Sequence, residues 1–88
     1  MIKYLEKMDI VEINRKTLEL HNESSEFLLI MPSDLEFIVE FVKIHNGEDI
    51  FNKALAYAVS LIVLHPFKNG NHRTSIYSAE RFLILNGY

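Results

Sequence analysis

Residues 49–74 read DIFNKALAYAVSLIVLHPFKNGNHRT, and this stretch decides the fold because it predicts two helices joined by a tight turn. If residues 50–64 form a helix, apolar side chains lie on nearly every side of it, which is typical of a buried central helix. Pro66 ends that helix, since a residue that precedes proline is pushed out of helical geometry. His65 is therefore expected at the end of the most buried element.

Three further helices are predicted around this central one. The first covers 10–21, behind a capping box that begins at Asp9. The second begins at a capping box with Ser33 and stops at the Asn-Gly pair 46–47. The last starts at Asn71, a favourable N-cap residue, and continues to a second Asn-Gly pair near the end of the chain.

A short apolar run, 27–31, lies between the first two helices and is too brief to form a helix of its own. It is the only strand candidate, and we interpret it as an edge strand or an extended flap. The sequence therefore predicts an all-α protein: a compact helical bundle with one short extended flap.

The composition indicates a single small domain. The chain has 88 residues, a formal net charge of -3 and no cysteine. One core and one domain, 1–88, are expected at this length. Without cysteine there is no disulfide framework, which is compatible with a reducing cytosol. The N-terminus lacks a signal-peptide pattern, and the longest apolar run is shorter than the ~20 residues of a membrane span. We therefore expect a cytoplasmic protein with no membrane partner.

The turn between the last two helices is locally basic, because 65–73 contains a lysine and an arginine but no acidic residue. A cation in the first turn of a helix is disfavoured by ~0.3–1 kcal/mol, and a bound anion would remove this conflict. We interpret the turn as a seat for a phosphate or a nucleotide. The residues of this seat are Lys68, Gly70, Asn71, His72 and Arg73. The plainer alternatives are that Lys68 is a solvated loop charge and Asn71 only an N-cap.

His65 stands at the mouth of this seat. A histidine before proline is by itself more often a structural cap. Beside a phosphate seat, however, its imidazole can take a proton from an attacking hydroxyl group. This combination favours phosphoryl or nucleotidyl transfer, in which positioning and charge neutralisation do most of the work.

The run HPFKNGNHR, 65–73, resembles the signature HPFx(D/E)GNxR of the Fic/Doc family, in the form of its death-on-curing (Doc) branch. The similarity is good over 49–88 and rests on helix order before that. It implies an all-α core with a flap that docks the target by main-chain pairing. It also implies transfer of phosphate or AMP from ATP, or another NTP, to a Ser, Thr or Tyr hydroxyl of a protein substrate, with Mg²⁺. Family cores continue beyond the position of Tyr88, so we expect the domain to be short at its C-terminus.

The resemblance also implies roles for single residues. His65 matches the general base, Arg73 the arginine that neutralises phosphate charge, and Phe67 the buried anchor of the loop. Gly70 and Asn71 match the phosphate-cradling turn. The target-docking flap would consist of Phe27, Leu28, Leu29 and Ile30.

Three residues depart from the family pattern. Asn69 stands where an Asp or Glu usually holds Mg²⁺, so it would be a weaker, neutral metal ligand and metal dependence is doubtful. His72 replaces the small glycine of AMP-transferring members, and Ile76 replaces their second arginine. The last two departures favour phosphoryl transfer over AMP transfer.

Two functions therefore stand as hypotheses. The first is a Doc-type transferase that acts as a toxin restrained by an antitoxin. The second is a catalytically degenerate Fic-fold module that binds a nucleotide or a partner protein. Apolar surface left over by so short a bundle could be covered by a second copy of the chain. Direct DNA binding is not expected, because the helix after the first Asn-Gly pair has Lys53 as its only cation.

Overall fold

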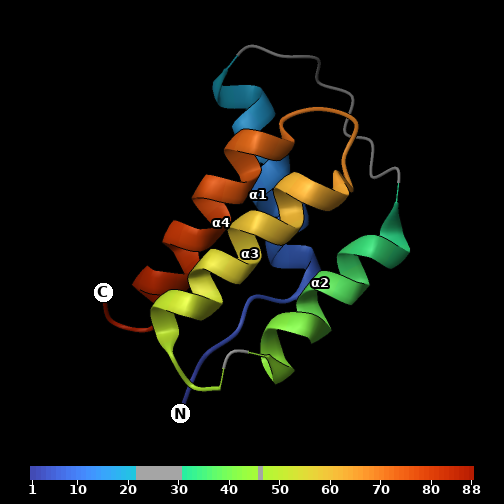
Figure 1. The fold of residues 1–88 in the computed structure, drawn as a ribbon. Helices are drawn as coiled ribbons and strands as arrows, with labels where there is room; N and C mark the ends of the chain where they lie inside the picture. Colours follow the sequence, from blue (N-terminus) through green and yellow to red (C-terminus); the bar gives the residue numbers. More distant parts are fainter. Residues whose placement is uncertain (22–30, 46) are drawn as a thin grey trace.

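The structure, a computed structural model, describes residues 1–21, 31–45 and 47–88 and contains four helices. They are α1 (Lys7–Leu20), α2 (Pro32–Ile44), α3 (Ile50–Leu64) and α4 (Asn71–Leu85). Figure 1 shows α3 between α4 and α2, with α1 behind them. The predicted all-α fold is confirmed. The predicted flap, 27–30, lies outside the described residues.

Helix α3 begins and ends where the sequence predicts. The carboxylate of Asp49 accepts a hydrogen bond from the backbone N–H of Asn52 at 3.0 Å and caps the helix. The helix ends at Leu64, one residue short of the His-Pro pair. Proline thus sets the length of α3 and the place where the chain turns back.

Helix α3 is buried on one face only, so the prediction of a helix buried on all sides was wrong. Its inner face packs against α4 and α2 through Ala54, Tyr57 and Leu61. Its outer face leaves several large apolar side chains in solvent. The sequence pattern misled because an apolar residue can face solvent as well as a core.

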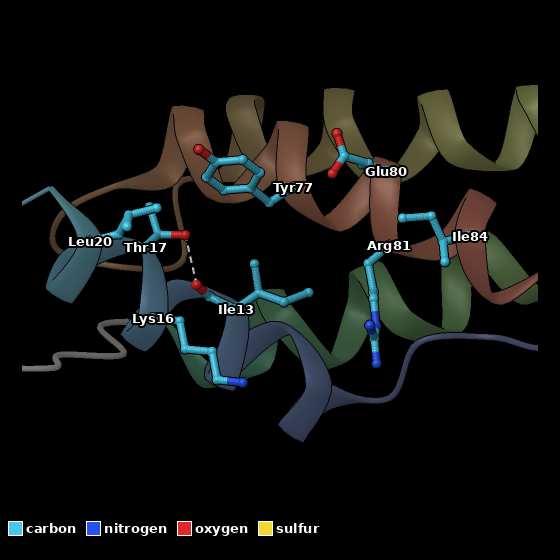
Figure 2. A pocket seen from close by; sticks show the side chains of 8 residues that line it. All are labelled: Ile13, Lys16, Thr17, Leu20, Tyr77, Glu80, Arg81 and Ile84. Carbon is cyan, nitrogen blue, oxygen red and sulfur yellow. Dashed lines mark hydrogen bonds between the residues drawn. The ribbon is translucent and has the colours of Figure 1, made fainter. Parts of the chain in front are cut away.

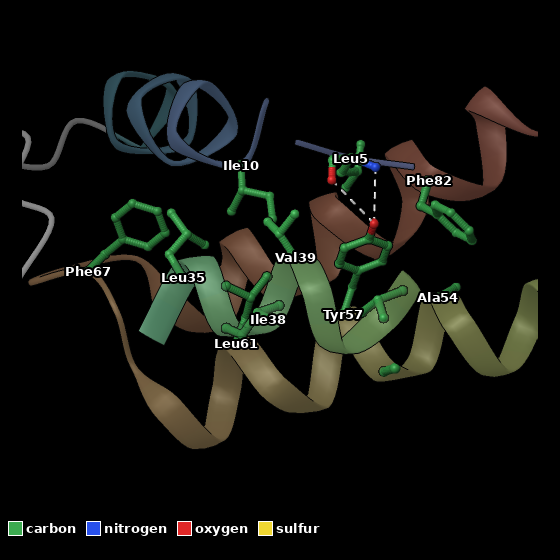
Figure 3. Packing of buried hydrophobic residues seen from close by; sticks show 12 residues of the cluster. Leu5, Ile10, Leu35, Ile38, Val39, Ala54, Tyr57, Leu61, Phe67 and Phe82 are labelled. Carbon is green, nitrogen blue, oxygen red and sulfur yellow. Dashed lines mark hydrogen bonds between the residues drawn. The ribbon is translucent and has the colours of Figure 1, made fainter. Parts of the chain in front are cut away.

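The core lies where the four helices and the N-terminal segment meet (Figure 3). Tyr57 is fully buried there, and its hydroxyl accepts a hydrogen bond from the backbone N–H of Leu5 at 3.0 Å. Burial raises the pKa of the Tyr57 hydroxyl far above its ordinary value. Tyr57 therefore ties the segment before α1 to the central helix.

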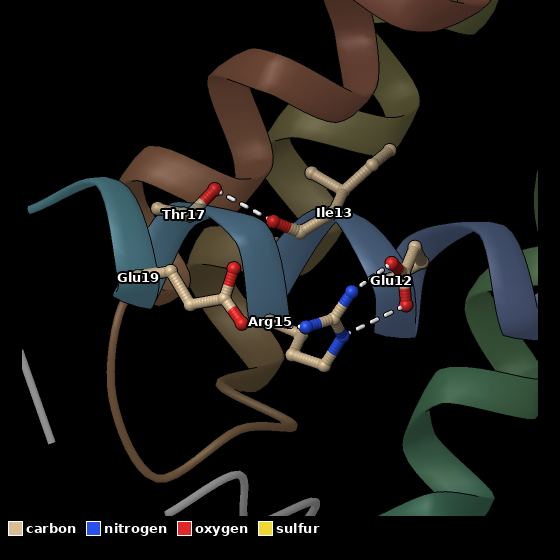
Figure 4. A network of polar contacts seen from close by, with 5 residues as sticks. All are labelled: Glu12, Ile13, Arg15, Thr17 and Glu19. Atoms are coloured by element: carbon tan, nitrogen blue, oxygen red, sulfur yellow. Dashed lines mark hydrogen bonds and ion pairs between the residues drawn. The ribbon is translucent and has the colours of Figure 1, made fainter. Parts of the chain in front are cut away.

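Two helix starts differ from the prediction. Helix α1 begins at Lys7, and Asp9 accepts a hydrogen bond from the Glu6 backbone N–H at 2.7 Å, as the third residue of the helix rather than as its cap. Glu12, the expected partner in the capping box, instead pairs with Arg15 on the exposed face (Figure 4). The start of α2 is Pro32, with Met31 as N-cap, so Ser33 lies inside the helix. Proline is well suited to the first helical position.

Lys53 is fully buried, although lysine is seldom buried without a charged partner. Its Nζ donates to the carbonyl oxygens of Val42 at 2.7 Å and His45 at 3.0 Å, at the C-terminal end of α2. It also lies 5.2 Å from the centre of the Tyr4 ring. Lys53 therefore closes the end of α2 and is not available to contact a nucleic acid.

Within the described ranges, no helix is both long and apolar enough to cross a bilayer.

Substitution Lys53→Met should cost about 1–3 kcal/mol of unfolding free energy, because it leaves buried carbonyls at the end of α2 without a donor. Urea unfolding followed by circular dichroism measures this. The matched control is Lys7→Met, which breaks only the surface pair with Glu36 and should cost less than about 1 kcal/mol. Equal stability of the two variants would refute the capping role of Lys53.

Candidate functional site

The structure gathers the predicted phosphate-seat residues around a single pocket of about 480 Å³, which lies where α3 ends and α4 begins. This volume is within the usual range for ligand sites. The lining residues are His65, Lys68, Asn69, Gly70, Asn71, His72 and Arg73. Every residue of the pocket thus comes from the segment 65–73.

His65 holds an unusual backbone conformation at the end of α3. Its φ and ψ are 49° and 59°, the left-handed region, and it is the only non-glycine residue with positive φ in the described ranges. Its N–H still donates to the Leu61 carbonyl at 3.2 Å. A left-handed conformation costs a non-glycine residue roughly 1–2 kcal/mol. The side chain is exposed at the pocket, so the strain accompanies a position that a ligand can reach.

The turn is closed by Asn71 and Phe67. The Asn71 side chain accepts a hydrogen bond from the Phe67 N–H at 3.0 Å and donates one to the Phe67 carbonyl at 2.7 Å. Phe67 is buried in the core beside Leu35 (Figure 3). The predicted N-cap role of Asn71 was wrong: Asn71 is the first residue of α4, and Gly70 is the N-cap. Its side chain spans the turn instead.

Gly70 is needed for two reasons. Its φ is 73°, which disfavours residues with a side chain. A Cβ at this position would also lie 3.2 Å from Leu18 Cδ2 on α1. The glycine therefore lets the turn pack closely on α1.

Asn14 on α1 braces the turn from behind, and no role was predicted for this residue. It is fully buried, and its Nδ2 donates to the Asn69 carbonyl at 2.9 Å and to the Thr74 hydroxyl at 3.0 Å. A polar residue on the buried face of a predicted helix was the available signal, because such a group needs a partner. α1 thus holds both the turn and the first part of α4.

The start of α2 also contacts this region. The N–H of Met31 donates to the carbonyl of Pro66 at 3.0 Å. The residue that follows the predicted flap therefore lies directly against the turn.

The pocket is cationic and contains no carboxylate. Lys68, His72 and Arg73 are exposed on it, and it opens at the N-terminus of α4. The first N–H groups of a helix have no helical acceptor, and in α4 the helical bonding begins with Thr74 N–H to Gly70 carbonyl at 2.8 Å. The arrangement suits an anion, because the helix end and the side chains of Lys68 and Arg73 are all positive.

The pocket residues do not fit a Mg²⁺ ion held by protein carboxylates. Such an ion is usually bound through one or two carboxylates together with phosphate oxygens. Asn69 offers only an exposed amide side chain, and its backbone carbonyl already accepts from Asn14. Among the described residues, no group of three or more histidine, cysteine or acidic side chains could hold a metal.

A second pocket, of about 280 Å³, lies between α1 and α4 and does not include the turn (Figure 2). Its surface is mainly apolar, with Lys16, Glu80 and Arg81 as the charged residues. Because these charges have both signs, this groove is a less suitable site for an anion than the turn.

Substitution Asn14→Leu should loosen the turn. Leucine fits the space but cannot donate to the Asn69 carbonyl, so we expect exchange of the Phe67 amide to accelerate by up to about tenfold, the equivalent of one lost hydrogen bond. Hydrogen exchange measured by NMR tests this. The control is Thr17→Val, which removes a buried hydroxyl group from the same helix. That hydroxyl donates its hydrogen bond to the Ile13 carbonyl within α1 and not to the turn. If both variants change the exchange equally, Asn14 does not brace the turn.

A sequence model of the Fic/DOC family matches residues 4–83. Comparison with curated proteins and with solved structures gives no match. The family match begins before α1, includes the whole turn and extends into the last turn of α4. The chain therefore belongs to the Fic/DOC family.

Proposed function

We propose that this protein transfers the terminal phosphoryl group of ATP, or of another nucleoside triphosphate, to a hydroxyl group of a target protein. Members of its family generally modify proteins by nucleotide-dependent transfer. The observation that carries the proposal is the pocket of the 65–73 turn, which combines a histidine, three cationic or titratable side chains and a helix N-terminus, with no carboxylate. The motif HPFKNGNHR resembles the form of the Doc branch, and this resemblance supports the proposal.

Residues 70–73 would seat the phosphate that is transferred. Backbone N–H groups at the start of α4 and the Arg73 side chain would stabilise the charge on its oxygens. Lys68, on the exposed side of the turn, adds a second cation. Since hydrogen bonds of the Asn71 and Asn14 side chains hold the turn, these groups would need little rearrangement when a phosphate binds.

His65 would act as the general base. Its imidazole would take the proton of the target hydroxyl while the hydroxyl oxygen forms a bond to the γ-phosphorus. The bond between that phosphorus and the bridging oxygen breaks, and the nucleoside diphosphate leaves with the electron pair. No step is assigned to a metal, because the pocket offers no carboxylate to hold one. Any Mg²⁺ would be bound mainly by the nucleotide phosphates.

Transfer of phosphate is favoured over transfer of AMP because the residues next to the phosphate seat leave little room for a second anion site. A diphosphate leaving group needs an open anion site, and here the bulky His72 lines the pocket. Ile76, one turn further along α4, is exposed and apolar and offers no second cation. The pocket therefore suits one terminal phosphate better than a departing diphosphate.

The alternative is a Fic-fold module that binds a nucleotide or a partner protein without turnover. The observation that favours it is again the absence of a carboxylate at position 69, since family members usually hold Mg²⁺ there. A toxin role, with a separate antitoxin as partner, is part of the first proposal.

We expect the purified chain, incubated with a cell lysate and ATP, to add about 80 Da to a target protein, the mass of one phosphoryl group. Label from γ-labelled ATP should be incorporated, and label from α-labelled ATP should not. Mass spectrometry of the labelled protein reads out the adduct and its site.

The control variant is His65→Asn. Asparagine tolerates the left-handed backbone of this position, so the fold should remain intact while the base is lost. We expect the rate to fall by about 10²–10⁴-fold. An AMP-sized adduct that depends on His65 would contradict phosphoryl transfer. ATP binding with no adduct would support the binding module instead.

A further inference from the structure

The outer face of α3 carries an exposed apolar stripe. Its members are Phe51 (59% exposed), Leu55 (60%), Val59 (49%), Ile62 (36%) and Val63 (69%). They recur every three or four residues, so they form one continuous row along the helix. This is the stripe that made α3 look like a fully buried helix in the sequence. Large apolar patches of this kind mark interaction surfaces on soluble proteins.

The stripe carries no charge. The only ionisable residues of α3 are Lys53 and Tyr57, and both are fully buried on the opposite face. The polar residues beside the stripe, Asn52 and Ser60, are neutral.

The stripe continues onto α2. Phe41 and Leu55 line a shallow hollow of about 300 Å³ between α2 and α3, and the ring of Phe37 stacks on that of Phe41 with 5.5 Å between their centres. Phe37 is itself 55% exposed. A partner seated on α3 would therefore meet aromatic side chains of α2 at its edge.

We propose that a second copy of this chain covers the stripe, with the two α3 helices packed antiparallel about a two-fold axis. In such a symmetric contact a charge near the two-fold axis would be buried close to the same charge of the partner, which is unfavourable. A charge-free stripe avoids this cost. A partner of a different sequence would instead favour complementary charges, which this face does not offer.

If the two-fold axis passes through the middle of the stripe, it determines which residues of the two α3 helices face each other. Phe51 and Val63 lie at its two ends, so antiparallel packing places Phe51 of one copy opposite Val63 of the other. Leu55 then faces Val59 across the axis. The small Ala58 lies between them on the sequence and allows the helices to approach to the usual ~8–10 Å.

The size of the surface is also suitable. At roughly 200 Å² for a large side chain, the exposed parts of the five stripe residues amount to about 500 Å², before Phe37 and Phe41 are added. A stable interface takes about 800 Å² from each partner, which the stripe, the aromatic edge and a polar rim can supply. None of the residues that line the 65–73 pocket belongs to the stripe, so the pocket stays open in the dimer.

Analytical ultracentrifugation of the full chain should give twice the monomer mass, and Leu55→Glu should give the monomer. The matched control is Ile84→Glu, at a similarly exposed apolar residue on α4, which should remain dimeric. A parent chain that is monomeric at every concentration, or a Leu55→Glu variant that stays dimeric, would overturn the proposal. So would a monomer that is instead found in complex with a different protein.

Disulfide formation tests the register and does not depend on the stability of Leu55→Glu. The chain has no cysteine, so only introduced pairs can form a bond. A mixture of Phe51→Cys and Val63→Cys chains should give a cross-linked dimer on mild oxidation, and each chain alone should give far less. Equal cross-linking of each chain with itself would contradict the antiparallel arrangement.

Discussion

The candidate site depends on the pair of hydrogen bonds between the Asn71 side chain and the backbone of Phe67. They close the turn between α3 and α4, and the buried Phe67 ring fixes that closed turn to the core. His65 precedes the closed turn in the sequence and Arg73 follows it, so the closed turn determines how these two residues lie relative to each other. If the turn opened, the pocket lined by residues 65–73 would lose its arrangement. A small polar contact therefore sets the geometry on which the proposed chemistry rests.

A second layer of contacts holds the turn in place. Asn14 reaches it from α1, Leu18 packs against Gly70, and the Met31 N–H binds the Pro66 carbonyl from the start of α2. Two helices, α1 and α2, therefore contact the nine residues of the turn. The strained backbone of His65 is consistent with this bracing, since strain persists only where the surrounding structure imposes it.

Much of this arrangement could be predicted from local sequence rules. Pro66 acts on the residue before it, so the end of α3 could be predicted. The match of 65–73 to a family signature pointed to a pocket that the structure does form. The predictions were wrong where contacts with distant parts of the chain determine the role of a residue. Asn71 prefers the N-cap in isolation, but the turn uses its side chain to bind Phe67.

The burial of α3 and the partners of Asn14 could not be predicted, for related reasons. Apolar periodicity shows which residues avoid water but not whether another helix or another chain covers them. Asn14 contacts residues more than fifty positions away, and no local pattern reports a contact of that range. Lys53 is a similar case, since its partners are the carbonyls of the preceding helix.

The central claim is that the turn is a preformed anion seat, and an NMR titration of the full chain with ATP tests it most directly. The claim predicts saturable shifts that are largest at the backbone amides of Gly70, Asn71, His72 and Arg73, with little change elsewhere in the helices. Absence of shifts at these amides would contradict it. So would shifts centred on the groove between α1 and α4, at residues such as Thr17 and Tyr77.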